Sequence, residues 1–316
     1  MGCILSIQDL KTSFYTRNGV VKAVEGVDLH LEEGKTFGLI GETGCGKSVL
    51  GLSVMRLLPR NARVEGKIFY RGQDLLQFSE GQMQRLRGKK IALIPQNPGS
   101  SLNPVLKIGI QIAEALQLHH RLPREQAWAK GREILSWLKL PAPENTMRVY
   151  PHQLSGGMKQ RVLAAIGMTG APDLLIADEP TKGLDAVIRS QVVAVLSQMV
   201  SQTKATLLVI THDLKVATRL CQQVAVMYAG EIVELGTAEQ IFNSPRHPYT
   251  RALLAAQPVN GLKPLDGFSP SLINLPPGCK FHPRCGYARE VCRQEHPPLM
   301  ETIAGNLVRC MFFDQG

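Results

Sequence analysis

Hydrophobic and polar positions alternate at strand spacing over the first part of the chain. Residues 4–14 alternate like an edge strand, and apolar segments of the same kind continue to about residue 40. Further strands are expected around residues 66–70 and 90–95. The pattern predicts an antiparallel β-subdomain near the N-terminus.

The middle of the chain places its apolar residues at helical spacing instead. Two stripes carry this pattern, one on each side of Pro123. Their members are Ile108, Ile112, Ala115 and Leu116, then Ala127, Gly131, Ile134, Leu135 and Leu138. A loop rich in proline and polar residues, 141–153, follows. These features predict an inserted helical subdomain at about residues 98–160.

Strand and helix patterns alternate from residue 173 to residue 223, which is typical of a parallel sheet covered by helices. Residues 224–236 then predict a hairpin that turns at Ala229-Gly230. The chain of 316 residues is 44% hydrophobic, enough for a sizeable core. We therefore expect an α/β fold.

Composition also limits the function. No run of 18 apolar residues occurs, so we expect no membrane-spanning helix, and no signal peptide is expected at the start. The formal charge is +10, but basic residues are scattered among acidic ones, so we expect no nucleic-acid partner. This charge suits a subunit that lies near anionic lipid.

A glycine-rich loop follows the apolar strand 36–40 and precedes a helical pattern. It consists of Gly41, Glu42, Thr43, Gly44, Cys45, Gly46, Lys47 and Ser48, with Val49 opening the helix. Backbone N–H groups of such a loop surround phosphate oxygens, and the helix N-terminus favours an anion. Lys47 is expected to reach the β- and γ-phosphates and Ser48 to bind Mg²⁺. The sequence therefore predicts a nucleotide site.

Cys45 occupies a position inside this loop. Its thiol is expected to face backbone N–H groups and the helix N-terminus, which favour the thiolate. We therefore expect Cys45 to have a lowered pKa and to react readily, although catalysis does not require it.

Further along the chain lie the residues that distinguish one nucleotide-binding class from another. Ser155, Gly156 and Gly157 precede a helix, a second site suited to phosphate. The strand 174–177 ends in Asp178, expected to hold Mg²⁺, and Glu179, expected to activate water. Three further polar candidates at expected strand ends or turns are Gln96, Asp185 and His212.

Over roughly residues 4–255 the chain resembles the ATP-binding cassette subunits of ABC transporters. The resemblance implies a P-loop NTPase (RecA-like) core with an antiparallel β-subdomain and an inserted helical subdomain. It implies that Glu179 is the general base, that His212 contacts the γ-phosphate, and that Gln96 links Mg²⁺ and water to a membrane partner. It also implies an aromatic residue stacked on adenine, for which Phe14 and Tyr15 are both candidates.

The resemblance further implies a head-to-tail dimer. Ser155, Gly156 and Gly157 would serve the nucleotide of a second ATPase subunit, and Asp185 would communicate across the interface. That second subunit is expected to be a related but different chain, and a homodimer stays open. Other implied partners are two transmembrane permease subunits and an extracytoplasmic solute-binding protein. This chain would lie peripherally on the cytoplasmic face of the inner (plasma) membrane.

Residues 244–254 resemble the segment that ends the cassette in oligopeptide, dipeptide and nickel permease ATPases. We therefore divide the chain into a cassette, 1–242, and a small cysteine-rich C-terminal extension, 243–316. The expected function is ATP hydrolysis that drives import of short peptides. A nickel or metallophore importer is the alternative, because 181–185 differ from the more usual Thr-Thr-Ala-Leu-Asp. A soluble ABC protein acting on ribosomes or DNA, and a regulatory subunit with an inert ATP site, fit less well.

Four cysteines lie in the C-terminal extension: Cys279, Cys285, Cys292 and Cys310. In a reducing cytoplasm they favour metal thiolates over disulfides. Their spacing lacks the paired Cys-x₂-Cys of zinc ribbons, although His282 or His296 could replace a thiolate. The family resemblance implies a [4Fe-4S] cluster at this site, with Zn²⁺ as the alternative.

Overall fold

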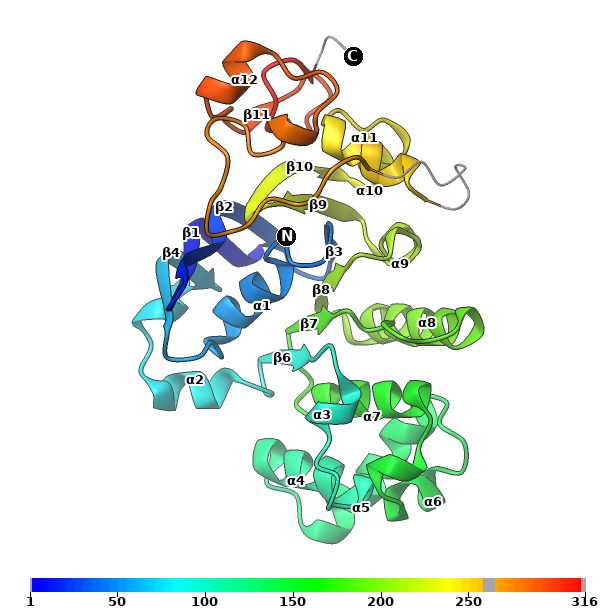
Figure 1. The fold of residues 1–316 in the computed structure, drawn as a ribbon. Coiled ribbons are helices and arrows are strands. Elements are labelled where there is room, and N and C mark those ends of the chain that lie inside the picture. Colours follow the sequence, from blue (N-terminus) through cyan, green and yellow to red (C-terminus); the bar gives the residue numbers. More distant parts are fainter. Residues whose placement is uncertain (1, 258–264, 314–316) are drawn as a thin grey trace. The chain divides into compact units, whose positions relative to one another are not determined.

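The computed structural model describes residues 2–257 and 265–313 and comprises two compact units (Figure 1). The first contains the described residues of 1–32, 36–77 and 210–316, and the second contains 33–35 and 78–209. None of the helices in the described part of the chain combines the length and the apolar character needed to cross a membrane.

The N-terminal sheet of the first unit is antiparallel, as predicted, with the strand order β2-β1-β4-β5. Its strands are β1 (Cys3–Thr16), β2 (Gly19–Glu32), β4 (Ala62–Tyr70) and β5 (Gln73–Asp74). The prediction of an edge strand was wrong, because β1 pairs with β2 on one side and β4 on the other. Alternating burial reports that one face is covered, but it does not report the number of neighbouring strands. Helix α1 (Lys47–Met55) packs against β1 and β2.

The second sheet of this unit runs in the order β11-β12-β10-β9-β3. Its strands are β3 (Thr36–Ile40), β9 (Gln223–Tyr228), β10 (Glu231–Thr237), β11 (Met300–Glu301) and β12 (Leu307–Val308). The predicted hairpin is confirmed, and Ala229 and Gly230 both adopt positive φ, 46° and 86°, as a tight two-residue turn requires. Helices α9 (Leu214–Leu220) and α10 (Ala238–Asn243) pack against β3 and against β9 and β10, respectively.

The C-terminal segment, residues 243–257 and 265–313, belongs to the same unit. It contains α11 (Pro248–Ala255) and α12 (Glu290–Gln294), and its strand β12 pairs with β10. Three buried aromatic rings join it to the hairpin: the ring centroid of Tyr249 lies 4.6 Å from that of Tyr228 and 5.4 Å from that of Phe281. The segment therefore shares a core with the strands beside the glycine-rich loop.

The second unit combines a parallel pair of strands, β6 (Ile91–Ile94) and β7 (Leu174–Asp178), with a group of helices. The helices are α2 (Glu80–Leu86), α3 (Pro98–Ser101), α4 (Ile108–His120), α5 (Arg124–Trp137), α6 (Pro143–Arg148), α7 (Gly156–Met168) and α8 (Ala186–Thr203). Strand β8 (Thr206–Thr211) leads the chain back into the first unit, so the predicted alternation of strand and helix is confirmed.

The predicted helical stripes form the packing faces of α4 and α5, with Ile112 and Leu135 fully buried. The helices missed in the second unit include α6 and α2. Helix α6 lies inside the stretch interpreted as a loop, and α2 begins at a capping box in which Ser79 accepts from the backbone N–H of Gln82. The Ser-x-x-Gln spacing at 79–82 was a readable signal for that second helix.

Candidate functional site

The glycine-rich loop connects β3 to α1 and depends on two glycines. Gly41 and Gly46 have positive φ values of 151° and 108°. A side chain on Gly41 would place its Cβ 2.2 Å from the Met227 carbonyl oxygen, and one on Gly46 would place it 2.0 Å from that of Ala23. Because neither contact is tolerable, these positions accept only glycine. Thr43 and Gly44 lie exposed at the tip of the loop.

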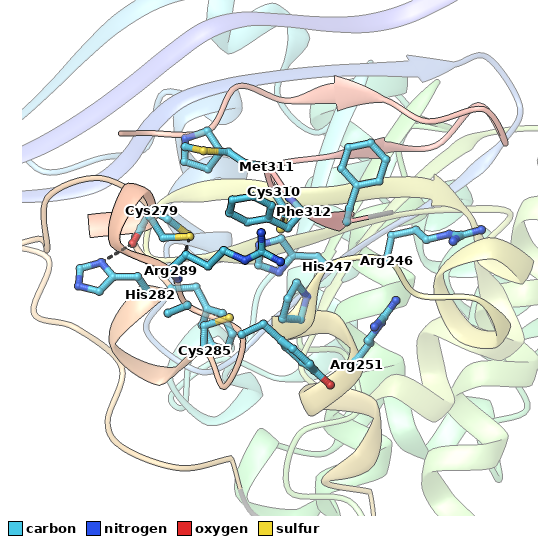
Figure 2. Close-up of a pocket in the computed structure, with 17 residues that line it drawn as sticks. Arg246, His247, Arg251, Cys279, His282, Cys285, Arg289, Cys310, Met311 and Phe312 are labelled. Carbon is cyan, nitrogen blue, oxygen red and sulfur yellow. Dashed lines mark hydrogen bonds between the residues drawn. The ribbon is translucent and has the colours of Figure 1, made fainter. Parts of the chain in front are cut away.

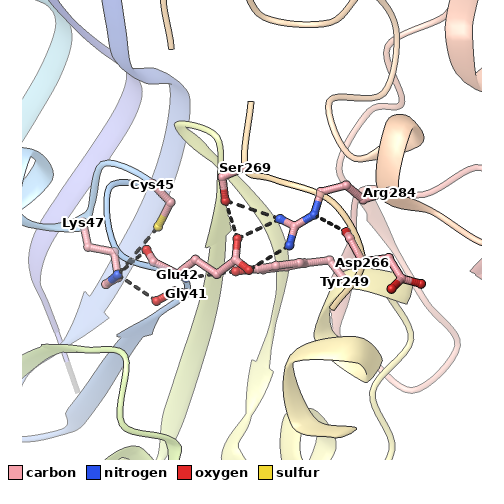
Figure 3. Close-up of polar contacts among 8 residues, drawn as sticks. All are labelled: Gly41, Glu42, Cys45, Lys47, Tyr249, Asp266, Ser269 and Arg284. Atoms are coloured by element: carbon pink, nitrogen blue, oxygen red, sulfur yellow. Dashed lines mark hydrogen bonds and ion pairs between the residues drawn. The ribbon is translucent and has the colours of Figure 1, made fainter. Parts of the chain in front are cut away.

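Lys47 is buried at the start of α1, with 5% of its surface exposed. Its ammonium donates hydrogen bonds of 2.8 Å to the carbonyl oxygens of Gly41 and of Glu42, inside the loop (Figure 3). The ammonium therefore sits within the curve of the backbone, as a phosphate-binding lysine must. Ser48 and Val49 follow in the first turn of the helix, where backbone N–H groups point out of the helix end.

The structure contradicts the expected reactivity of Cys45. The residue is 6% exposed, and its Sγ lies 3.7 Å from the Lys47 Nζ. Burial raises the pKa of the thiol, and this effect outweighs the nearby ammonium. Sequence position alone suggested a thiolate because it revealed the helix N-terminus but not the loss of water around the sulfur.

The loop is also attached to the C-terminal segment. The Glu42 carboxylate accepts hydrogen bonds from Arg284 at 2.8 and 3.0 Å and one from the Ser269 hydroxyl at 2.5 Å (Figure 3). The backbone N–H of Glu42 donates to the Tyr249 hydroxyl at 2.9 Å. Burial alone would raise the pKa of the Glu42 carboxyl, but the Arg284 and Ser269 hydrogen bonds outweigh it, so the pKa is lowered.

Three other residues that were predicted to contact the nucleotide lie in the first unit. His212 is exposed directly after β8, ahead of the Asp213 side chain that caps α9. Phe14 and Tyr15 are neighbours near the end of β1, and Tyr15 is exposed, whereas Phe14 is half-buried. Successive residues of a strand point to opposite faces, so only one of these rings can face α1.

The second unit holds the carboxylates and Gln96. Strands β6 and β7 are parallel, with Ile94 opposite Ala177, so both carboxyl ends lie at one edge of the sheet. Asp178 ends β7 and is buried together with Glu179, which has a positive φ of 47°. Gln96 lies half-buried just beyond β6. The structure thus brings Gln96 and the two acidic residues to the same sheet edge.

The predicted signature residues begin α7. Ser155 is the N-cap and its hydroxyl accepts from the Met158 backbone N–H, while Gly156 is exposed beside it. Gly157 is buried, and a Cβ there would lie 2.2 Å from the Ile188 side chain. Asp185 caps α8 by accepting from the Ile188 N–H at 2.9 Å. The exposed surface at the start of α7 therefore consists of backbone groups and the Ser155 hydroxyl.

The four C-terminal cysteines line one pocket together with Arg289, His282 and apolar side chains (Figure 2). All four are half-buried, and the Cys279 N–H donates to the Cys292 carbonyl oxygen at 2.8 Å. Burial raises the pKa of Cys279 to about 11. Within residues 2–257 and 265–313, however, no three His, Cys, Asp or Glu side chains are arranged to hold a metal ion. The four cysteines therefore share one pocket, and a metal bound there remains a prediction.

Comparison with known families identifies the family of this chain. Residues 24–182 match the family model described as ABC transporter, a range that contains the glycine-rich loop, the signature and the two carboxylates. The chain belongs to the ABC transporter family. As a member of this family it is an ATP-hydrolysing transport subunit. Residues 233–292 match a second model, described as oligopeptide/dipeptide transporter, C-terminal region.

Relatives of this ABC transporter protein extend over its full length. It is 41% identical to a dipeptide transport ATP-binding protein of Bacillus subtilis, with 99% of this chain and 95% of the relative covered. It is also 41% identical to an oligopeptide transport ATP-binding protein of Haemophilus influenzae, with 98% and 97% covered. A dimeric structure of a bacterial ABC transporter cassette matches with a TM-score of 0.67 at 23% identity, covering 74% and 98%. That likeness confirms the expected fold of the cassette.

Arg284, Ser269 and Tyr249 were missed as neighbours of the loop. Tyr249 lies in the segment that carried the subfamily resemblance, but no local pattern gave it a contact with Glu42. The Glu42–Arg284 pair spans 242 residues of sequence, so no periodicity or spacing rule could have found it.

Proposed function

We propose that this ABC transporter subunit hydrolyses ATP to drive the import of di- and oligopeptides. The observation that carries the substrate class is the match of residues 233–292 to the oligopeptide/dipeptide C-terminal region. The names of two relatives covered over nearly their full length, a dipeptide and an oligopeptide transport protein, support the same class.

The glycine-rich loop and α1 would bind the phosphates of ATP. Lys47 would exchange its hydrogen bonds to the loop carbonyls for the β- and γ-phosphates, and backbone N–H groups at the start of α1 would bind the remaining oxygens. The two glycines that accept no side chain hold the backbone close enough for this contact. We assign His212 to the γ-phosphate.

Phe14 is the better candidate for stacking on adenine. The Thr12 hydroxyl lies 2.9 Å from that of Ser53 on α1, so Thr12 faces this helix. The register against β4 is unbroken from Thr12 to Phe14, which places Phe14 on the same face, while Tyr15 points the other way. A ring on the helix side of the sheet lies on the side of the nucleotide loop.

Ser48, Gln96 and Asp178 are the residues that would hold Mg²⁺. The fit within the second unit is supported by Asp178 and Gln96, whose oxygen donors lie at the shared end of β6 and β7. Bound Mg²⁺ would neutralise charge on the phosphates. Glu179 would take the proton from the attacking water, and its position directly after Asp178 suits this role.

The signature, Ser155 to Gly157, would serve the nucleotide of a second ATPase subunit, with Asp185 at the same interface. We propose a non-identical paralogue as that subunit, together with two permease subunits and an extracytoplasmic solute-binding protein. Residues around Gln96 would meet the permeases at the cytoplasmic face of the membrane. The exposure of Ser155 and Gly156 on α7 supports this arrangement.

We further propose that the four C-terminal cysteines hold a [4Fe-4S] cluster. Four half-buried thiols line one pocket, which is the donor set such a cluster takes. Each thiolate of a cluster binds a different iron, so the thiols need not converge on a single point. The cluster would stabilise the C-terminal segment.

The test is ATP turnover by the assembled transporter. The chain would be reconstituted with its permeases, its partner ATPase and its cognate solute-binding protein. Turnover is expected to rise when the binding protein carries a di- or oligopeptide and to stay at its basal rate with free Ni²⁺. Stimulation by Ni²⁺ or a metallophore complex alone would overturn the peptide assignment.

A further inference from the structure

The ion pair between Glu42 in the glycine-rich loop and Arg284 is largely enclosed on its arginine side. The Arg284 side chain is 5% exposed and forms two hydrogen bonds to the Glu42 carboxylate. Its Nε donates a third, of 2.9 Å, to the Asp266 carbonyl oxygen of the C-terminal segment. The planar guanidinium therefore joins the loop to that segment with fixed geometry (Figure 3).

Tyr249 holds the backbone of the same residue. Its hydroxyl accepts from the Glu42 N–H, and its ring is fully buried between Tyr228 and Phe281. Since the ring cannot move without disturbing this core, the hydroxyl is a fixed point for the peptide unit between Gly41 and Glu42. The loop is thus held at Glu42 through both its side chain and its main chain.

That peptide unit is central to phosphate binding. Lys47 donates to the carbonyl oxygens of Gly41 and Glu42, so rotation of this part of the loop would move the lysine acceptors as well. A phosphate cradle made of backbone N–H groups works only when each group already points at the ligand.

We propose that Arg284 and Tyr249 are positioning residues for ATP: the C-terminal segment holds the phosphate loop in its binding geometry through Glu42. This inference rests on the proposed function, because the loop must bind ATP for its geometry to matter. Arg284 and Tyr249 act through Glu42 and touch no nucleotide themselves.

The first test measures binding of Mg-ATP to the full chain. Arg284→Gln removes the charge and one arm of the fork, and we expect the Kd for Mg-ATP to rise about tenfold, since breaking one side of a buried hydrogen-bonded charge pair is costly. Arg284→Lys keeps the charge and is expected to recover part of that loss. The control is Arg309→Gln, because the Arg309 guanidinium donates to the Ile232 and Pro297 carbonyl oxygens, away from the loop.

Thermal unfolding without nucleotide separates positioning from general stability. If Arg284→Gln and Arg309→Gln lower the unfolding temperature to a similar extent, but only Arg284→Gln weakens ATP binding, the proposal is supported. Equal Kd values for the two variants would overturn it. Failure of the unmodified chain to bind Mg-ATP would instead overturn the proposed function, so the two failures are distinguishable.

A double-mutant cycle tests whether Arg284 acts through Glu42. If it does, the effects of Glu42→Gln and Arg284→Gln on the Kd are non-additive, and the double variant binds ATP about as well as either single one. Additive effects would show that Arg284 acts by another route. Tyr249→Phe keeps the ring and removes the acceptor of the Glu42 N–H, and we expect a several-fold rise in the Kd.

Discussion

The Lys47 ammonium lies 2.8 Å from the carbonyl oxygen of Gly41, at the opposite end of the same loop. This lysine therefore closes the loop on itself. In the proposed ATP complex, phosphate oxygens would replace the Gly41 and Glu42 carbonyls as acceptors of an ammonium that already lies inside the loop. Such preorganisation would lower the cost of binding.

Glu179→Gln should separate binding from chemistry. The amide keeps the shape of the side chain but cannot accept a proton, so ATP should bind while hydrolysis at this site falls roughly 10²–10⁴-fold. Turnover would be measured with the site of the partner ATPase disabled. Lys47→Ala should instead weaken nucleotide binding itself, and Glu133→Gln, at an exposed glutamate paired with Lys130, is the control. Near-normal turnover by Glu179→Gln would remove this residue from the mechanism.

Ser155→Arg should leave ATP binding by the isolated chain almost unchanged and suppress turnover in the complete transporter. Ser155 caps α7, so part of any effect would come from the lost cap, worth about 1 kcal/mol. Ser155→Ala removes the cap without adding bulk and measures that part. Equal loss of binding and turnover would contradict a signature that serves the partner's nucleotide.

The C-terminal cysteines should retain iron. Protein purified without oxygen is expected to be brown and to contain iron and sulfide in comparable amounts, as measured by elemental and sulfide analysis. Cys285→Ser should lose the colour and lower the stability of the C-terminal segment, whereas Cys3→Ser, at an exposed cysteine outside the pocket, should not. Zinc without sulfide would favour the alternative, and protein free of both metals would refute the site.

Cys45 should react slowly in the folded protein. Its burial and raised pKa leave little accessible thiolate at neutral pH, so an alkylating reagent should label Cys3 much faster. Mass spectrometry of the labelled peptides measures both rates in one sample. Cys45→Ser is expected to keep ATPase activity. If Cys45 were labelled as fast as Cys3, its thiol would be reactive, as the sequence predicted.

Acid should weaken the attachment of the loop. The pKa of Glu42 is lowered in the folded protein, so its stabilising effect is complete above the ordinary value of 4.5 and is lost as pH falls through the folded value. The difference in free energy of unfolding between wild type and Glu42→Gln should be constant from pH 7 to about 5.5 and shrink below that. Urea titrations at each pH give this difference. A gap that widens in acid would mean the carboxylate is not stabilised by Arg284.

Local patterns predicted most of the elements, because their causes are local. The strand before the glycine-rich loop, the hairpin at Ala229-Gly230 and the stripes of α4 and α5 all follow from periodicity and turn chemistry. The loop, the signature and the carboxylates were recognisable because their chemistry needs fixed residues at fixed spacing. Helices α2 and α6, which were missed, are short, and helix propensity is weak over so few residues.

Features set by burial and distant contacts could not be predicted. The central place of β1 depends on β4, about fifty residues further on, and the pKa of Cys45 depends on how completely the loop excludes water. Phe14 and Tyr15 were equal candidates for stacking on adenine in the sequence. The contact with Ser53 shows which face of the sheet meets α1, and so favours one of them. Each of these features depends on three-dimensional contacts that sequence patterns do not contain.

The pairing of Glu42 with Arg284 also sets an order of events during synthesis. The two residues are 242 positions apart, and ribosomes add roughly 5–20 residues per second, so on the order of 10–50 s pass between their appearance. For that time a nascent chain carries a phosphate loop whose anchor has not yet been made. Glu42 can be held only after residues 249–284 have been synthesised, so the proposed anchoring of the phosphate loop is a late event in folding.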